Sequence, residues 1–311
     1  MNFLYIILGF TLLIFGGNWL LKSAVSISLR LQIPKIVIGM TIVSFATSAP
    51  ELIVSIQSAI DGYPDLALGN VIGSNIANLG FVLGITLLIA KIDVQRSFYT
   101  TNWPVMMIAS LMLFYFLYND AAISFVEGII LFSFLLIFLV YLLRFQKQAV
   151  VDEMPEDDEA LPNYKTAMFL VLGALGLWGG SELLIVGATE MAIDFGVSER
   201  LIGITVVSIG TSIPELAASI IAIIKKEKAI SLGNLIGSNV FNILAVLGLT
   251  SIITPIKVED QALLTNDIYW MLGISFSILI WVFMPVKMRL ERKSGVILLL
   301  IYAAFLYATI R

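Results

Sequence analysis

The chain of 311 residues contains no cysteine and no histidine. Without cysteine it can form no disulfide and carry out no thiol chemistry. Without histidine it has no Ser-His-Asp triad, no histidine-ligated zinc and no histidine proton relay. Charged residues are also scarce, at 13%, whereas 59% of the residues are hydrophobic. This is too little polar surface for a soluble globule of this length, so the composition predicts an integral membrane protein.

Uncharged or nearly uncharged runs recur along the whole chain, each near the roughly 20 residues that a helix needs to cross a bilayer core. They cover residues 3–21, 36–60, 66–90, 97–119, 121–143, 166–189, 201–224, 229–254, 268–286 and 294–310. The first run has no basic segment before it and no obvious cleavage site, so we expect a transmembrane helix rather than a removable signal peptide. The predicted fold class is an all-α membrane protein with ten transmembrane helices.

The lysines and arginines predict the orientation of these helices. If the amino terminus is outside, fifteen of the eighteen basic residues fall in cytoplasmic loops, and only Arg200, Lys257 and Arg311 fall on the other side. This bias predicts that both termini lie on the non-cytoplasmic face.

One long polar segment, residues 146–165, divides the chain into a first half, 1–145, and a second half, 166–311. It contains two prolines and six acidic residues between Asp152 and Glu159. We interpret it as an acidic cytoplasmic linker between two five-helix repeats. A cation-sensing role is the alternative, but the segment lacks the D-x-D-x-D-G spacing of a calcium loop.

The two halves contain an internal repeat. Residues 39–84 align without gaps on residues 203–248, at an offset of 164, and 23 of the 46 positions are identical. Five predicted spans, an odd number, separate the two copies, so the second copy enters the membrane from the opposite side. Inverted repeats of this kind are typical of secondary transporters, whose binding sites lie near the midplane where the repeats meet.

Each copy begins with a helix that carries hydroxyl groups and one carboxylate on a single face. The residues are Ser44, Thr47, Ser48, Glu51 and Ser55 in the first copy and Ser208, Thr211, Ser212, Glu215 and Ser219 in the second. A hydroxyl in a membrane helix often bonds only to its own backbone. A carboxylate at this depth is expensive and is seldom structural, so Glu51 and Glu215 are the leading functional candidates.

The next helix of each copy carries amides and a hydroxyl four residues apart. These are Asn70, Ser74 and Asn78, matched by Asn234, Ser238 and Asn242. Between them, Gly69, Gly73, Gly233 and Gly237 are expected to allow close approach of neighbouring helices. Glu182, in the weaker repeat WGGSEL, is expected near a helix end, as an interfacial or supporting group.

A proline precedes each candidate carboxylate. Pro50 and Pro214 have no N–H to donate to the carbonyls of Ala46 and Gly210, so each helix is expected to kink and free backbone oxygens there. Hydroxyls, amides, carbonyls and carboxylates are hard oxygen donors that suit Ca²⁺ and also Na⁺. Two carboxylates are neutralised by one Ca²⁺ or by two Na⁺. A site that holds either set of ions is neutralised and can therefore cross a low-dielectric barrier, as obligatory exchange requires.

The segments GTSIPEL with GNLIGSNVFNI, and ATSAPEL with GNVIGSNIANL, resemble the paired repeats of the calcium/cation antiporter superfamily, specifically the sodium/calcium exchangers and their bacterial and archaeal members. The resemblance implies a Na⁺/Ca²⁺ antiporter that works by alternating access in a prokaryotic-type plasma (inner) membrane. It implies a transporter rather than an enzyme, with Ca²⁺ and Na⁺ as substrates and no tightly bound cofactor.

The resemblance also implies roles for individual residues. Glu51 and Glu215 would be the central ligands, and Asn78 and Asn242 would complete the centre. Further oxygens would come from Thr47, Ser48, Thr211, Ser212, Ser74 and Ser238. The backbone carbonyls of Ser44 and Ser208 would serve outer Na⁺ sites.

Several alternatives remain at this point. Potassium-dependent members have an aspartate where this chain has Asn242, and proton-coupled members resemble a GNxxE pattern that is absent here, so the resemblance favours Na⁺ coupling over K⁺-dependent or H⁺ exchange. A cation channel and an intramembrane hydrolase with a carboxylate dyad are less favoured readings. The expected surroundings are the lipid bilayer, with no nucleic-acid partner. The sequence does not give an oligomeric state, and a monomer is compatible with it.

Overall fold

A computed structural model describes residues 2–145, 160–195 and 210–310. The first half of the chain forms α1 (Asn2–Leu31), α2 (Lys35–Ile38), α3 (Ser44–Thr47), α4 (Ala49–Ile60), α5 (Pro64–Ala77), α6 (Leu83–Ile89), α7 (Trp103–Asp120) and α8 (Phe125–Phe145). The second half forms α9 (Asn163–Asp194), α12 (Ile213–Ile224), α13 (Lys228–Phe241), α14 (Gly248–Ile253), α15 (Ile268–Phe283) and α16 (Arg292–Ile310). Short π-helical segments continue several of these helices.

The π-helical segments follow the sequence repeat. They are η1 (Gly39–Val43), η2 (Asn78–Val82), η3 (Phe98–Asn102), η6 (Asn242–Leu247) and η7 (Leu263–Asp267). The segments η2 and η6 begin at Asn78 and Asn242, which are equivalent positions of the two copies. Single π-helical turns inside α-helices occur frequently at functional sites, so this match indicates that both asparagines belong to a functional site.

Eight of the described helical segments are long and apolar enough to cross a membrane. The pair Lys35–Thr47 and Ala49–Ile60 meets the same test as one broken span, and Ile213–Ile224 is a shorter apolar helix. In chain order these segments fall on the predicted runs. The seventh run, 201–224, is described only in part, so the count of ten and the sidedness of the termini stay predictions. The helix α9 starts at Asn163, so the last residues of the predicted linker are helical, while the linker's acidic residues lie outside the described ranges.

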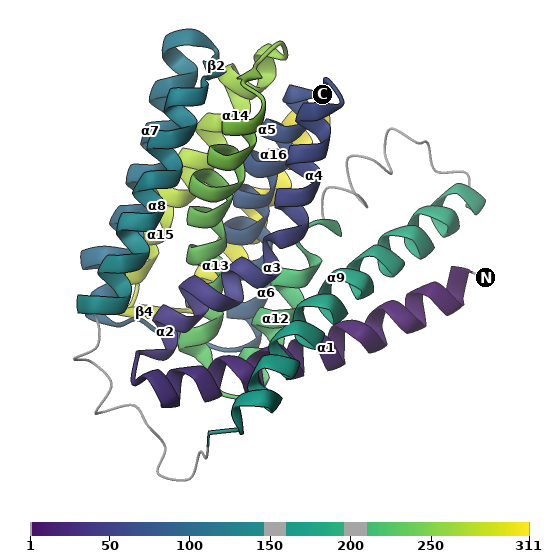
Figure 1. Cartoon of the computed structure of the whole chain (residues 1–311), viewed down its shortest axis with the longest axis vertical. Coiled ribbons are helices and arrows are strands. Elements are labelled where there is room, and N and C mark those ends of the chain that lie inside the picture. Colours follow the sequence, from purple (N-terminus) through teal and green to yellow (C-terminus); the bar gives the residue numbers. More distant parts are fainter. Residues whose placement is uncertain (1, 146–159, 196–209, 311) are drawn as a thin grey trace. The chain divides into compact units, whose positions relative to one another are not determined.

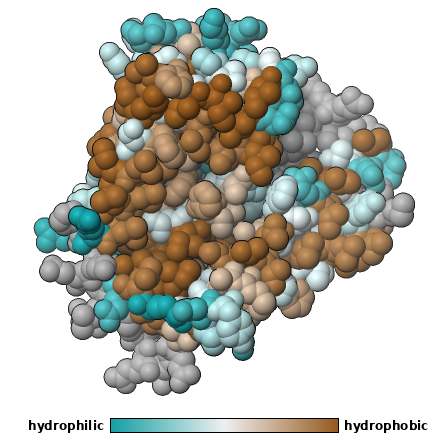
Figure 2. Space-filling view, in the orientation of Figure 1, coloured by the Kyte–Doolittle hydropathy of each residue, from teal (hydrophilic) through white to brown (hydrophobic). Residues whose placement is uncertain are grey.

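The outer faces of the helices carry apolar side chains. Ile137 in α8 and Leu300 in α16 are 66% and 64% exposed, and many other leucines, isoleucines and aromatic residues are exposed as well. Figure 2 shows these apolar residues over much of the visible face. An exposed apolar surface of this extent is suited to lipid rather than water.

By spatial contact the chain forms two compact units. Unit 1 contains residues 1–47 and 142–234, and unit 2 contains residues 48–141 and 235–311. Each unit takes segments from both predicted halves, so the two five-helix repeats remain a property of the sequence and a prediction.

Unit 1 is built around two long helices, α1 and α9, which lie side by side (Figure 1). Glycines allow their backbones to touch. A Cβ built on Gly9 would come within 2.9 Å of the Gly180 carbonyl oxygen. Elsewhere in this unit, Lys35 forms an ion pair of 2.7 Å with Glu227, and both side chains are largely buried.

In unit 2 the last helix of each half packs on the other half. The helix α16 contacts α6, where a Cβ on Gly295 would lie 2.8 Å from the carbonyl oxygen of Gly84. The equivalent contact joins α8 to α14, where a Cβ on Gly128 would lie 2.8 Å from the carbonyl oxygen of Gly248. Each half therefore completes part of the core of the other.

Two pairs of short antiparallel strands connect loops of unit 2. Strand β1 (Ile92–Asp93) pairs with β4 (Arg289–Leu290), and β2 (Ala122–Ile123) pairs with β3 (Ile256–Lys257). Arg289 also donates a hydrogen bond of 2.7 Å to Asp93, which raises the pKa of the guanidinium. The first pair joins two loops that are predicted to lie on one side of the membrane, and the second joins two that are predicted to lie on the other.

Candidate cation-binding site

Glu51 lies in the first turn of α4, directly after a break in the helix. The helix α3 ends at Thr47, α4 begins at Ala49, and Ser48 between them has φ −89° and ψ 3°. Pro50 occupies the first turn of α4, where a missing N–H costs little. The predicted interruption before Glu51 is therefore confirmed. The side chain is almost fully buried, at 1% exposure, at the helix end where the backbone dipole favours a negative charge.

The second copy of the motif, in unit 1, has the same local geometry. Ser212 has φ −90° and ψ 4°, and α12 begins at the next residue with Pro214 and Glu215 in its first turn. Glu215 is 0% exposed. Both candidate carboxylates are therefore buried in the amino-terminal turn of a helix that begins directly after a serine of similar backbone geometry.

In unit 2, α4 is fixed to α5 by Asn70. Its side-chain amide donates to the Ser55 hydroxyl at 3.0 Å and lies 3.4 Å from the carbonyl oxygen of Glu51. The Ser55 hydroxyl in turn lies 3.4 Å from the carbonyl oxygen of Ala67. These bonds set the position of the turn that carries Glu51.

The repeat-equivalent asparagine, Asn234, has a similar role in unit 1. Its amide donates to the Ser219 hydroxyl at 3.5 Å, and its side-chain oxygen accepts from the Thr47 hydroxyl at 3.2 Å. The Ser44 hydroxyl lies 2.9 Å from the backbone carbonyl of Asn234 and 2.8 Å from that of Gly39. The structure thus brings Ser44 and Thr47 together on one helix-to-helix contact.

Four buried asparagines form a reciprocal network in unit 2. The amide nitrogen of Asn75 donates to the backbone carbonyl of Asn239 at 3.3 Å, and that of Asn239 donates to the backbone carbonyl of Asn75 at 3.2 Å. The amide of Asn242 donates to the side-chain oxygen of Asn75 at 3.1 Å, and the amide of Asn78 donates to that of Asn239 at 3.2 Å. Each bond has its counterpart at the offset of 164, so the network has the symmetry of the repeat.

Three of the candidate ligand atoms in unit 2 are buried without a hydrogen bond to any residue within the described ranges. They are the Ser74 hydroxyl oxygen and the side-chain oxygens of Asn78 and Asn242. The Ser212 hydroxyl in unit 1 shares this property. Buried oxygens of this kind are costly unless a partner satisfies them, and a hard cation is a suitable partner.

The remaining candidates are also located. Ser48 and Ser238 are buried in unit 2, and Thr211 is half-buried in unit 1. Ser208 lies outside the described residues. Within residues 2–145, 160–195 and 210–310 no group of three or more acidic side chains that could hold a metal ion is present.

Two expectations from the sequence are wrong. A Cβ on Gly73 would meet no described residue within 4 Å, and one on Gly69 would make only an ordinary contact of 3.6 Å, so these two glycines do not mediate close packing among the described helices. A Cβ on Gly233, by contrast, would come within 2.3 Å of the Ile36 carbonyl oxygen. Glu182 is not near a helix end. It lies well inside α9 with an exposed side chain, because α9 extends to Asp194.

Asn75 and Asn239 were not among the residues expected at the site. Both are identical in the two copies of the motif, within GSN, but each is one position away from the face shared by Ser74 and Asn78 or Ser238 and Asn242. Their identity in both copies is the only signal in the sequence that could have found them.

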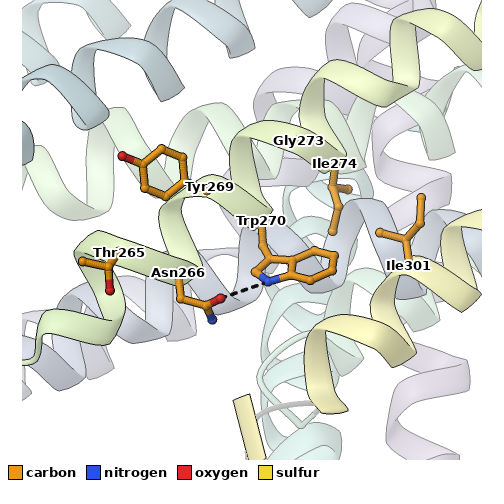
Figure 3. Close-up of a pocket in the computed structure, with 7 residues that line it drawn as sticks. All are labelled: Thr265, Asn266, Tyr269, Trp270, Gly273, Ile274 and Ile301. Atoms are coloured by element: carbon orange, nitrogen blue, oxygen red, sulfur yellow. Dashed lines mark hydrogen bonds between the residues drawn. The ribbon is translucent and has the colours of Figure 1, made fainter. Parts of the chain in front are cut away.

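A separate groove of unit 2 has a different character. It has a volume of about 480 Å³ and is lined by Thr265, Asn266, Tyr269, Trp270, Gly273, Ile274 and Ile301 (Figure 3). Its Asn266 oxygen already accepts a hydrogen bond of 3.2 Å from the Trp270 indole. Among the residues that the structure describes, no carboxylate lines this groove, so it offers no charged oxygen to a cation.

Comparison with known proteins places these features in context. The family model described as sodium/calcium exchanger protein matches residues 1–144 and 165–311. The putative antiporter CaxA of Alkalimonas amylolytica is 38% identical, with 98% of this chain and 97% of the relative covered. The sodium/calcium exchanger MaX1 of Methanosarcina acetivorans is 28% identical over 98% and 97% of the two chains. A solved structure of the sodium-calcium exchanger NCX_Mj is 26% identical, covers 97% of each chain and superposes with a TM-score of 0.82.

Proposed function

Because the chain belongs to the sodium/calcium exchanger family, we propose that it exchanges Na⁺ for Ca²⁺ across a prokaryotic plasma (inner) membrane by alternating access. The observation that supports this most strongly is the buried glutamate in the first turn of two helices, α4 and α12, each of which begins directly after a serine, Ser48 or Ser212. A buried carboxylate is costly without a compensating positive charge. One Ca²⁺ or two Na⁺ would compensate two such charges equally, which links the movement of one ion species to the return of the other.

The ligand assignment is part of the same proposal. Glu51 and Glu215 supply the charge, and the oxygens of Ser74, Asn78 and Asn242 supply neutral ligands. Hydroxyl or backbone oxygens of Thr47, Ser48, Thr211, Ser212 and Ser238 add to these, and the carbonyls of Ser44 and Ser208 serve Na⁺. The side-chain oxygens of Asn78 and Asn242, which are buried and have no hydrogen-bond partner among the described residues, support this assignment, because amide oxygens are ligands that Ca²⁺ accepts.

The coupling ion can be tested with the purified protein in proteoliposomes. Uptake of ⁴⁵Ca²⁺ is measured with an imposed Na⁺, K⁺ or H⁺ gradient, each applied alone with the membrane potential clamped. We expect uptake only when Na⁺ is present inside the vesicles and low outside. Uptake driven by the pH gradient alone would replace this proposal with H⁺/Ca²⁺ exchange, and uptake without any counter-ion would indicate a channel.

A further inference from the structure

The orientation of two side-chain amides in unit 2 follows from their partners. A backbone carbonyl can only accept hydrogen bonds, so the bond from Asn75 to the Asn239 carbonyl requires the Asn75 amide nitrogen to face it. The same nitrogen also lies 3.8 Å from the sulfur of Met271, another acceptor. The side-chain oxygen of Asn75 is therefore left to face Asn242.

That oxygen can bond only to a donor, so Asn242 must present its nitrogen to Asn75 and turn its own oxygen away. The equivalent chain of bonds applies to the other copy. The amide nitrogen of Asn239 faces the Asn75 carbonyl, its oxygen faces Asn78, and the oxygen of Asn78 is turned away. All four side chains are at most 1% exposed, so solvent does not compete for these bonds.

We infer that Asn75 and Asn239 are positioning residues that hold the amides of Asn242 and Asn78, respectively, with oxygen rather than nitrogen directed at the transported cation. The inference rests on the proposed function, in which Asn78 and Asn242 are ligands. A flipped amide would present its N–H donors to a cation, which is repulsive. Neither Asn75 nor Asn239 contacts the ion, and each acts through one hydrogen bond to its own ligand.

The network makes a specific pairing: Asn75 acts on Asn242, and Asn239 acts on Asn78. Removing the Asn239 side chain leaves Asn75 bonded to the backbone carbonyl of residue 239, so Asn242 keeps its orientation. Removing the Asn75 side chain likewise leaves Asn78 in place. A purely structural role for the two asparagines would show no such pairing.

The test measures Ca²⁺ affinity as the concentration that gives half of the maximal thermal protection in detergent, a binding readout that does not depend on transport. Asn75→Leu and Asn239→Leu, which remove the hydrogen-bonding oxygen at similar size, are each expected to weaken Ca²⁺ binding about 10- to 100-fold, as loss of an outer partner of a metal ligand does.

The decisive comparison uses aspartate at the ligand positions, because a carboxylate offers an oxygen in either orientation. In the Asn242→Asp background, Asn75→Leu is expected to change Ca²⁺ affinity less than about threefold, whereas Asn239→Leu keeps its full effect. In the Asn78→Asp background the expectation is reversed: Asn239→Leu should change Ca²⁺ affinity less than about threefold, whereas Asn75→Leu keeps its full effect. Asn75→Ala and Asn239→Ala test the same pairing if the leucine variants do not fold.

The outcomes separate the inference from the proposed function. If the aspartate substitutions alter Ca²⁺ affinity but the leucine effects are the same in every background, the positioning role is wrong and the ligand assignment stands. If Asn78→Asp and Asn242→Asp leave Ca²⁺ affinity unchanged, the ligand assignment itself is wrong and the inference falls with it. Wild-type affinity in Asn75→Leu would overturn the inference directly.

Discussion

The amide of Asn70 donates a hydrogen bond of 3.0 Å to the hydroxyl of Ser55, and so joins α5 to the helix that carries Glu51. The second copy repeats the bond between Asn234 and Ser219. A polar tie between two membrane helices at this point holds the broken helix in place. The carboxylate can then lie at the start of α4 without a continuous helix to support it.

Removal of this tie is expected to destabilise the protein. Asn70→Ala removes the amide that donates to the Ser55 hydroxyl, at a cost of about 1–3 kcal/mol. Thermal unfolding in detergent measures the loss. The loss of stability caused by Ser55→Ala should be smaller in the Asn70→Ala background than in the unmodified chain, because the two residues share one hydrogen bond. Asn119→Ala is the control, since Asn119 is exposed and bonds only to its neighbour Asp120 in the hydrogen bonds described. Equal effects of Asn70→Ala and Asn119→Ala would refute the role of the tie.

Alanine substitutions of two glycines in equivalent helices, Gly233 and Gly73, are expected to have opposite effects on thermal stability. A Cβ on Gly233 would lie 2.3 Å from the carbonyl oxygen of Ile36 and 3.2 Å from the Cα of Gly39, so Gly233→Ala must push two backbones apart. Around Gly73 a Cβ has open space, and alanine favours the helix by up to about 1 kcal/mol over glycine. We therefore expect Gly233→Ala to lower the melting temperature markedly and Gly73→Ala to leave it unchanged or raised. The reverse order would contradict the packing described for unit 1.

The buried ion pair of unit 1 gives a third prediction. Lys35 and Glu227 have side chains only 11% and 14% exposed, so Glu227→Gln removes the carboxylate of a largely buried ion pair and is expected to cost about 3 kcal/mol. Replacement of both residues by methionine removes both charges and should cost less than the single change. The exposed pair Arg289 and Asp93 serves as the comparison, because water screens it, and Asp93→Asn should have a much smaller effect on thermal unfolding. A double variant less stable than Glu227→Gln would argue against this reading.

Much of the architecture could be predicted from the sequence because it depends on composition and on the repeat. Long apolar runs indicate spans, and a proline next to a lone carboxylate indicates a break, which the structure has at Ser48. The break is sharper than a proline kink, since the helix stops and begins again within one residue.

The arrangement of the amides could not be predicted in the same way. Which atom of Asn242 faces away from Asn75 depends on how the Asn75 amide is held by the backbone carbonyl of Asn239, and Asn75 lies 167 residues before Asn242 in the chain. The π-helical turn that begins at Asn242 has no recognisable sequence pattern, and it changes the direction of the residues that follow. Gly69 could not be told from a packing glycine because its sequence context, LGN, is the same as that of Gly233, which lies in a close contact.

The central claim is that both buried glutamates compensate the charge of the transported cations. It is tested most directly by Na⁺-driven ⁴⁵Ca²⁺ uptake into proteoliposomes containing Glu51→Gln or Glu215→Gln. Glutamine keeps the size of the side chain and removes its charge. Glu190→Gln, an exposed position on α9, is the matched control. We expect uptake at the protein-free background in both Glu51→Gln and Glu215→Gln, with normal amounts of folded protein, and uptake like that of the unmodified chain in Glu190→Gln. Na⁺-driven Ca²⁺ uptake retained in either Glu51→Gln or Glu215→Gln would contradict the account.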